Sequence, residues 1–234
     1  MADTSIAVRD GKFSAYLASP KNLSAGQKAP GILVIQEIFG VNKVMRDICD
    51  NLAAQGYVAL CPDLFWRQEP GIQITDQSEA EWQRAFQLFQ GFDIDKGVED
   101  LVASLAHLRK LPNCAGKAGT VGFCLGGKLA YLMATRSTAD CNISFYGVGI
   151  EGALNEAGKI SKPLLMHIAA EDKFVPKEAQ AQIKETLSRN GAVAIHVYAG
   201  CDHAFARVGG AHWNADAARH ANERTAAFFK KHLA

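Results

Sequence analysis

The stretch that decides the fold is Thr120-Val121-Gly122-Phe123-Cys124-Leu125-Gly126-Gly127. Its apolar start predicts a strand at residues 120–123, and residues 125–135 have helical composition without proline. The order glycine, any residue, nucleophile, any residue, glycine between a strand and a helix is typical of a nucleophile elbow. The glycines let strand and helix approach, and the helix N-terminus favours a thiolate and orients N–H groups toward an oxyanion. The stretch therefore predicts Cys124 as nucleophile and the Leu125 N–H as oxyanion donor.

Two other interpretations of this stretch compete with the elbow. Residues 122–128 also fit the phosphate-binding pattern G-x-x-x-x-G-K, but position 129 is Leu where that loop needs Ser or Thr for magnesium. Alternatively, Cys124 is a small buried residue in a glycine-rich packing turn, because free cysteines are usually inert and buried. The choice between an active and a structural Cys124 depends on the rest of the chain.

The rest of the chain alternates strands with helices, which predicts an α/β fold with a mostly parallel central sheet flanked by helices on both faces. The predicted strands are residues 31–35, 57–60, 143–146, 164–168 and 194–198. The predicted helices are residues 45–52, a segment that begins after the capping box at Ser78, and residues 98–108, 178–190 and 214–232. Residues 67–76 are predicted to form a loop. Because no repeat or long linker interrupts this pattern, residues 1–234 are expected to form a single domain.

An elbow nucleophile requires an acid and then a histidine, in that chain order, on loops that follow later strands. Asp172 follows the strand at 164–168, and His203 follows the strand at 194–198. Ligands bind at this carboxyl end of the strands in open α/β sheets. Glu171 and Asp202 compete for the acid role, and Asp172 could instead cap a turn or helix. His167 lies within an apolar strand and is expected to be a hydrogen-bonded core residue.

Composition and charge exclude several classes of function. The 25 Lys and Arg residues against 24 Asp and Glu give a net charge of +1, which argues against a nucleic-acid partner. No apolar run is long enough to span a membrane and no signal-peptide core is present, so we expect a cytoplasmic protein without a membrane partner. The 6 cysteines contain no C-x-x-C pair, so we expect free thiols and no metal site.

Taken together, the motifs make this chain resemble the dienelactone hydrolases. In chain order they are Glu37-Ile38-Phe39-Gly40, Cys61-Pro62-Asp63-Leu64, Gly122-Phe123-Cys124-Leu125-Gly126-Gly127, Asp172-Lys173-Phe174-Val175-Pro176 and His203-Ala204-Phe205-Ala206-Arg207. The resemblance extends from about Ile32 to Phe229. A cysteine at the elbow combined with Q-E-I-F-G at a strand end separates this family from most α/β-hydrolases, which carry serine.

The resemblance implies carboxymethylenebutenolidase activity, the hydrolysis of dienelactone to maleylacetate in the catabolism of catechols and chlorocatechols, without a cofactor. It implies that Cys124 is the nucleophile, His203 the base and Asp172 its orienting acid. Glu37 would be the extra acidic residue of the family, which holds or receives the thiol proton, although a buried carboxylate there could also cap a turn or pair with an arginine. The Ile38 N–H would be the second oxyanion donor.

The substrate is itself a carboxylate, so the pocket should hold a cation. Arg207, four residues after His203, matches the arginine of the family and could bind a carboxylate bidentately, although a surface salt bridge is the alternative. The family usually has a basic residue and a tyrosine where this chain has Trp82 and Phe86, which we expect to contact substrate. Arg84 lies about 200° around the helix from Trp82 and is not an easy substitute.

Two further positions differ from the family. Asp202 stands where glycine is expected, and Ala204 stands where serine is common. With Trp82 and Phe86, these departures leave open a broader cysteine-dependent esterase or lactonase. A non-catalytic binding protein on the same fold is the third class of function.

Overall fold

The computed structural model describes residues 2–24 and 26–234, which form two compact units, one of the described residues up to 119 and one of residues 120–234. In the first unit the strand order is β1-β2-β4-β3-β5, and in the second it is β5-β6-β7-β8, because β5 runs from one into the other. β1 and β2 are antiparallel, β2 pairs with β4 antiparallel, and β3 and β4 are parallel. The expected α/β fold with a mostly parallel sheet is confirmed, whereas the expected single domain stays a prediction.

The elements of the first unit are the strands β1 (Ala2–Val8), β2 (Gly11–Ala18), β3 (Ala29–Ile35), β4 (Val58–Pro62) and the start of β5 (Cys114–Phe123), and the helices α1 (Lys43–Ala54), α2 (Glu79–Gln90) and α3 (Ile94–Lys110). The second unit contains the end of β5, the strands β6 (Asn142–Phe145), β7 (Leu164–Ala169) and β8 (Val193–Tyr198), the helices α4 (Leu125–Arg136), α5 (Lys177–Leu187) and α6 (Ala215–Leu233), and the 3₁₀ segment η1 (Glu151–Lys159).

Local sequence explains where two helices of the first unit begin and end. The Ser78 hydroxyl accepts a hydrogen bond from the Glu81 N–H at 3.3 Å, so the expected capping box starts α2. α1 ends just before Gly56, whose φ of +96° is the left-handed conformation that glycine tolerates. Residues 67–76 contain no helix or named strand, as expected.

The strands β1 and β2 and the 3₁₀ segment η1 were not predicted, and β5 is longer than the predicted strand. The hairpin of β1 and β2 lies where the sequence is rich in polar residues, and only one face of β2 is buried, with Phe13 and Ala15 turned inward. β5 begins at Cys114, six residues before the predicted strand, in a glycine-containing segment of weak strand propensity. The 3₁₀ segment η1 has no regular apolar repeat of its own.

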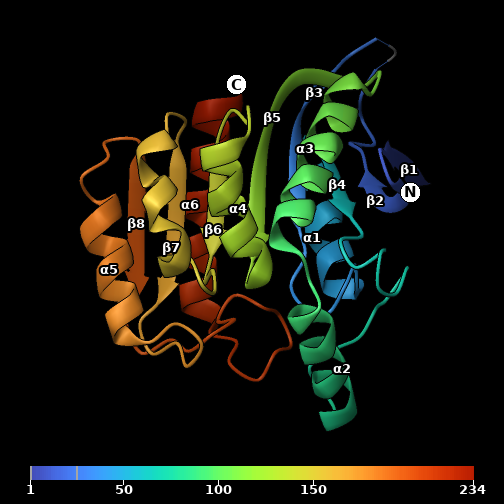
Figure 1. The fold of residues 1–234 in the computed structure, drawn as a ribbon. Helices are drawn as coiled ribbons and strands as arrows, with labels where there is room; N and C mark the ends of the chain where they lie inside the picture. Colours follow the sequence, from blue (N-terminus) through green and yellow to red (C-terminus); the bar gives the residue numbers. More distant parts are fainter. Residues whose placement is uncertain (1, 25) are drawn as a thin grey trace. The chain divides into compact units, whose positions relative to one another are not determined.

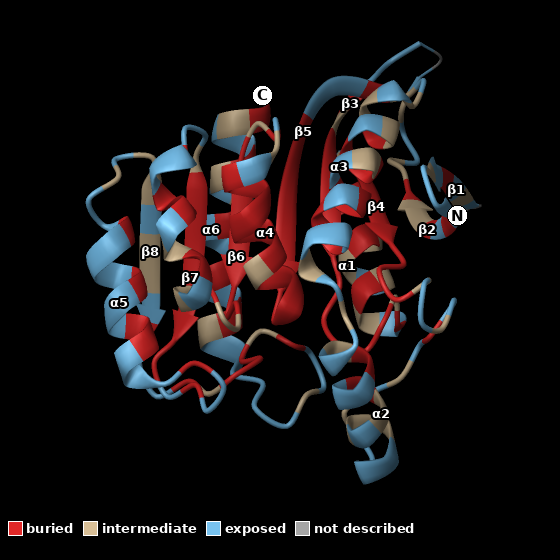
Figure 2. Ribbon diagram, in the orientation of Figure 1, coloured by how far each residue is buried: buried red, intermediate tan, exposed pale blue. Residues whose placement is uncertain are grey.

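The strand register assigns side chains of the second unit to two faces. Ser144 and Met166 are paired residues that point to one face, whereas Phe145 and His167, one residue further along, point to the other. α4 and α5 cover the first face, and α6 covers the second, where Thr225 of α6 bonds His167 (Figure 1). β6 and β7 are buried, and β8 is partly exposed (Figure 2).

Within the described residues, no helix combines the length and apolarity needed to cross a membrane.

His167 is the hydrogen-bonded core histidine that the sequence predicts. Its Nδ1 lies 2.8 Å from the Tyr198 hydroxyl and its Nε2 lies 3.1 Å from the Thr225 hydroxyl, so both ring nitrogens have partners. Burial, with smaller contributions from His196 and Arg224, lowers the pKa of His167 to about 3. The side chain is therefore neutral at physiological pH.

We expect His167→Gln to weaken the pH dependence of stability between about pH 6.5 and pH 3. In that window the unfolded chain binds a proton on His167 and the folded protein does not, so the free energy of unfolding falls as pH falls, by up to ~1.4 kcal/mol per pH unit. Urea unfolding of wild type and variant, followed by circular dichroism at several pH values, measures this slope. Equal slopes in the two proteins would contradict the assignment.

Candidate active site

Cys124 occupies a strained turn between β5 and α4. Its φ of 57° and ψ of −117° are unusual for a residue with a side chain, and such strain is found mainly where function requires it. A Cβ atom on Gly122 would overlap the backbone carbonyl of Gly126, and one on Gly127 would overlap the carbonyl of Phe145. Both glycines are therefore required by close backbone approach.

Backbone hydrogen bonds hold the turn in place. The Cys124 N–H donates to the Phe145 carbonyl of β6 at 3.1 Å, and the Cys124 carbonyl accepts from the Gly127 N–H at 3.0 Å. Leu125 is the first residue of α4, where amide groups have no acceptor within the helix. The thiol of Cys124 therefore lies at a helix N-terminus, which favours negative charge.

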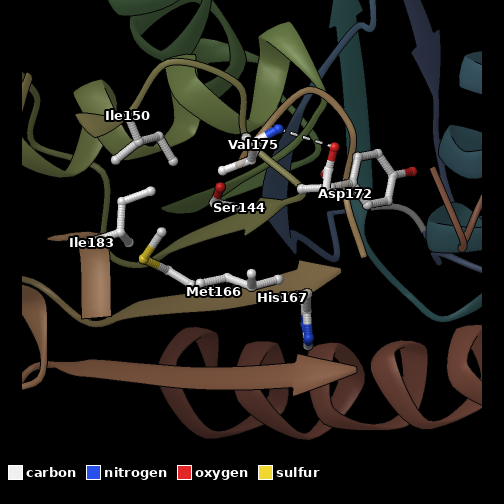
Figure 3. Close-up of a pocket in the computed structure, with 10 residues that line it drawn as sticks. Ser144, Ile150, Met166, His167, Asp172, Val175 and Ile183 are labelled. Carbon is white, nitrogen blue, oxygen red and sulfur yellow. Dashed lines mark hydrogen bonds between the residues drawn. The ribbon is translucent and has the colours of Figure 1, made fainter. Parts of the chain in front are cut away.

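Asp172 and His203 meet on the loops that follow β7 and β8. The Oδ2 of Asp172 lies 2.9 Å from the Nδ1 of His203, and the two side chains are only 1% and 5% exposed. The other oxygen, Oδ1, accepts hydrogen bonds from the Phe174 N–H at 2.8 Å and the Val175 N–H at 3.2 Å, the latter drawn in Figure 3. These bonds leave Asp172 a single orientation in which Oδ2 faces the histidine.

The His203 ring is fixed by two aromatic neighbours. Tyr146 and Phe174 contact it edge to face, with ring centroids at 5.1 and 4.9 Å. Its Nε2 is buried. Burial alone would lower the pKa of His203, but the negative charge of an ionised Cys124 and the bond to Asp172 raise it to about 10. The ring is therefore suited to take and hold a proton from the thiol.

The competing acids have other partners. Glu171 is 57% exposed and pairs with Lys177 at 2.9 Å. Asp202 lies beside the histidine in sequence, but its carboxylate accepts the backbone N–H of His203 at 2.7 Å instead of bonding the ring. Of these three carboxylates, Asp172 is the one hydrogen-bonded to the His203 ring.

Arg207 is buried on the same loop as His203. Its N–H donates to the Ala204 carbonyl at 2.9 Å, and its carbonyl accepts from the Gly210 N–H at 3.1 Å, so the arginine lies in a compact turn. The residue is only 7% exposed. Buried arginines are normally paired, and the predicted role of Arg207 in binding substrate stays a prediction.

Glu37 and Ile38 belong to the first unit, just after the end of β3, and both are buried. The preceding residue, Gln36, fixes this segment. Its amide nitrogen donates to the Glu37 carbonyl at 3.3 Å, and its amide oxygen accepts the Leu64 N–H at 3.1 Å. The predicted roles of Glu37 and Ile38 stay predictions.

Trp82 and Phe86 also lie in the first unit, on α2. Their rings stack with centroids 5.5 Å apart, and Trp82 meets Phe39 edge to face at 5.1 Å. The Trp82 indole N–H is bound to the Asp76 carbonyl at 3.1 Å. Arg84 is bound to the carboxylate of Glu69.

Sequence reasoning missed the contact of Tyr146 with the histidine. Tyr146 follows β6 with a φ of 37°, which no local sequence signal indicates, and this conformation accompanies the contact of its ring with His203. The cavity in Figure 3, beside Asp172 and Ser144, has a volume of about 10 Å³. Because that is about the space one water molecule needs, this cavity is too small to be the substrate pocket.

Comparison with known proteins identifies the family. The dienelactone hydrolase family profile matches residues 13–233, which is nearly the whole chain. The chain belongs to the dienelactone hydrolase family. A relative from Azospirillum brasilense is 54% identical, with all of both chains covered. The carboxymethylenebutenolidase of Pseudomonas putida is 41% identical, over 91% of this chain and 88% of that protein.

Solved structures agree with this membership. A crystal structure from Klebsiella pneumoniae subsp. pneumoniae superposes with a TM-score of 0.86 at 26% identity, covering 98% of this chain and 97% of that one. An esterase of Pyrococcus furiosus shares the fold, with a TM-score of 0.73 at 18% identity, over 100% of this chain and 93% of that one. This dienelactone hydrolase family member has the α/β-hydrolase fold and is a hydrolase of ester or lactone bonds.

We expect Gly122→Ala to lower the free energy of unfolding by roughly 2–4 kcal/mol, because the added methyl group overlaps the Gly126 carbonyl. Urea unfolding measures the change. Gly152→Ala is the matched control, since a Cβ there meets no atom within 4 Å. Equal stability of the two variants would contradict the close approach at the elbow.

Proposed function

We propose that the protein hydrolyses dienelactone to maleylacetate through Cys124, His203 and Asp172, in the catabolism of catechols and chlorocatechols. The observation that carries the proposal is the buried 2.9 Å bond between Asp172 and His203, in the same unit as the strained turn of Cys124. Nucleophile, acid and base also follow each other in the chain order that an elbow hydrolase requires.

The first half of the reaction forms a thioester. His203 takes the thiol proton at Nε2, and the Cys124 sulfur attacks the lactone carbonyl carbon, so that the carbonyl electron pair moves to oxygen. The amides of Leu125 and, by family resemblance, Ile38 would stabilise this oxyanion. Collapse of the intermediate breaks the ring carbon–oxygen bond, and the ring oxygen leaves as a conjugated enolate that stays tethered to the acyl group. An enolate is a better leaving group than an alkoxide, so a thiol nucleophile is sufficient.

The second half consumes water. His203, having returned its proton to the enolate as this becomes a ketone, removes a proton from water, and the resulting hydroxide attacks the thioester carbonyl. The carbon–sulfur bond breaks, the thiolate recovers its proton from His203, and maleylacetate is released. Atoms and charges balance with lactone and water alone, so the proposal requires no cofactor.

Substrate recognition in this proposal depends on charge and shape. Arg207, buried beside the turn at Ala204, would bind the carboxylate of the substrate through its planar fork. Trp82 and Phe86 would offer aromatic surfaces where the family usually has a basic residue and a tyrosine. Glu37 would hold the thiol proton in a hydrogen bond from Cys124 before substrate binds, until His203 takes that proton. The proposed location is the cytoplasm, with no nucleic-acid or membrane partner.

A broader esterase is the second candidate, because stacked Trp82 and Phe86 supply no second cation and Arg84 is bound to Glu69. Steady-state hydrolysis of cis- and trans-dienelactone, compared with p-nitrophenyl acetate, separates the two. Efficient dienelactone turnover supports the first candidate. Cleavage of the nitrophenyl ester without dienelactone turnover supports the second.

We expect Cys124→Ala to lower kcat by roughly 10³-fold or more, because no other group then forms the acyl intermediate. Absorbance assays with dienelactone and p-nitrophenyl acetate measure the loss. Cys141→Ala, which changes another buried free cysteine of the same unit, is the matched control and should keep near-normal activity. Near-normal turnover by Cys124→Ala would overturn the mechanism.

Asp172→Asn should lower kcat/KM by less than Cys124→Ala and shift the upper limb of its pH profile to lower pH. The hydrogen bond that His203 donates to Asp172 is one of the causes that raise the pKa of His203, so a weaker bond lets the imidazolium lose its proton at lower pH. Glu171→Gln, which neutralises the exposed neighbour, serves as the control. An unchanged upper limb in Asp172→Asn would argue against this pairing.

A further inference from the structure

We propose that Asp202 is a positioning residue that aligns His203 with Asp172 by joining the loop after β7 to the loop after β8. The inference rests on the proposed function, because it concerns the pair that would activate Cys124. It explains why this chain has an aspartate where the family resemblance predicts a glycine.

One oxygen of Asp202 binds backbone from both loops. Its Oδ1 accepts the N–H of His203 at 2.7 Å and the N–H of Lys173 at 3.2 Å. Lys173 directly follows Asp172 in the chain, so a single acceptor fixes the backbone at both members of the acid–histidine pair. The bond to His203 is local, whereas the bond to Lys173 connects residues 29 positions apart.

A second link lies on the other side of the pair. The Glu171 N–H donates to the Cys201 carbonyl at 2.8 Å, and the Ala170 N–H donates to the Tyr198 carbonyl at 3.0 Å. The two loops are thus joined by backbone bonds up to residue 201, and beyond it the side chain of Asp202 supplies the acceptor. The bond between Asp172 and His203 falls between these links. Without Asp202, that bond has an anchor on one side only.

The charge of Asp202 has a smaller part in this arrangement. Its Oδ2 lies 2.9 Å from the Lys173 ammonium and 3.7 Å from the His212 ring, but Lys173 is 75% exposed. Exposed ion pairs contribute little because solvent screens them. Burial raises the pKa of Asp202, but hydrogen bonds from the Lys173 side chain and from the His203 and Lys173 amides outweigh it and lower the pKa. The ionised carboxylate can only accept hydrogen bonds, so it is suited to bind the two backbone N–H donors.

This division of roles predicts different effects for different substitutions. Asp202→Gly removes the acceptor of both amides and frees the backbone, so we expect kcat to fall by roughly 10- to 100-fold, as misplacement by about 1 Å does, with KM nearly unchanged. Asp202→Asn keeps an amide oxygen in place of Oδ1 and should restore kcat to within roughly threefold of wild type. Lys173→Met removes only the ion pair and should cost less than about threefold.

The experiment measures kcat and KM for p-nitrophenyl acetate, and the pH profile of kcat/KM, in the full-length wild type and these three variants. Asp216→Asn, an exposed aspartate of α6, is the control for loss of one negative charge. The upper limb should move to lower pH by roughly one unit in Asp202→Gly, because the hydrogen bond that His203 donates to Asp172 stabilises the protonated ring. Among the described residues, Lys173 and His212 are the charged side chains paired with Asp202, so Lys173→Met and a His212→Gln variant show whether charge causes the shift.

A wild-type kcat and pH profile in Asp202→Gly would overturn the inference. So would Asp202→Asn and Lys173→Met losing as much activity as Asp202→Gly, since charge would then be the cause. If Asp202→Gly does not fold, Asp202→Ala is measured in its place, because it removes the same acceptor and leaves a less flexible backbone. Cys124→Ala distinguishes the two proposals: an active Cys124→Ala refutes the proposed function, whereas an inactive one beside a fully active Asp202→Gly refutes only the role of Asp202.

Discussion

The backbone at Cys124 is the constraint on which the candidate site depends. A residue with a side chain is strained at a φ of 57°, and contacts of the surrounding chain have to offset the free-energy cost of that strain. Many of these contacts are made by the backbone. The Cys124 N–H donates to β6, and Gly122 approaches the Gly126 carbonyl too closely for any side chain. The position of the nucleophile is therefore set by main-chain geometry, which thermal motion of side chains disturbs little.

The acid and the histidine follow a different principle. They lie on two loops, which are usually more mobile than strands, yet both side chains are almost completely buried. Both carboxylate oxygens of Asp172 have a named donor, and the His203 ring is held between Tyr146 and Phe174. Burial makes the pair costly to separate, because each group would lose its partner in a low-dielectric environment. The positions of Asp172 and His203 on these loops are therefore as well fixed as those of residues in regular secondary structure.

Local patterns in the sequence were sufficient for the elements that carry the site. The elbow, the strands before Asp172 and His203, the capping box at Ser78 and the core position of His167 each have a short-range signature. The hairpin of β1 and β2 and the start of β5 were missed because polar and glycine-containing strands lack apolar periodicity. The contacts of Tyr146 and Asp202 depend on residues far apart in the chain, so the sequence marked Asp202 as unusual without giving the reason.

The hydrogen bonds around His167 depend on one another. Arg224 can only donate, so the Tyr198 oxygen accepts from it, and the neutral His167 ring donates through one nitrogen and accepts through the other, so Tyr198 and Thr225 have opposite roles toward it. Replacing one member therefore leaves a buried donor or acceptor at its neighbour. Among relatives of this protein, the four residues that join α6 to the sheet are expected to be exchanged as a set.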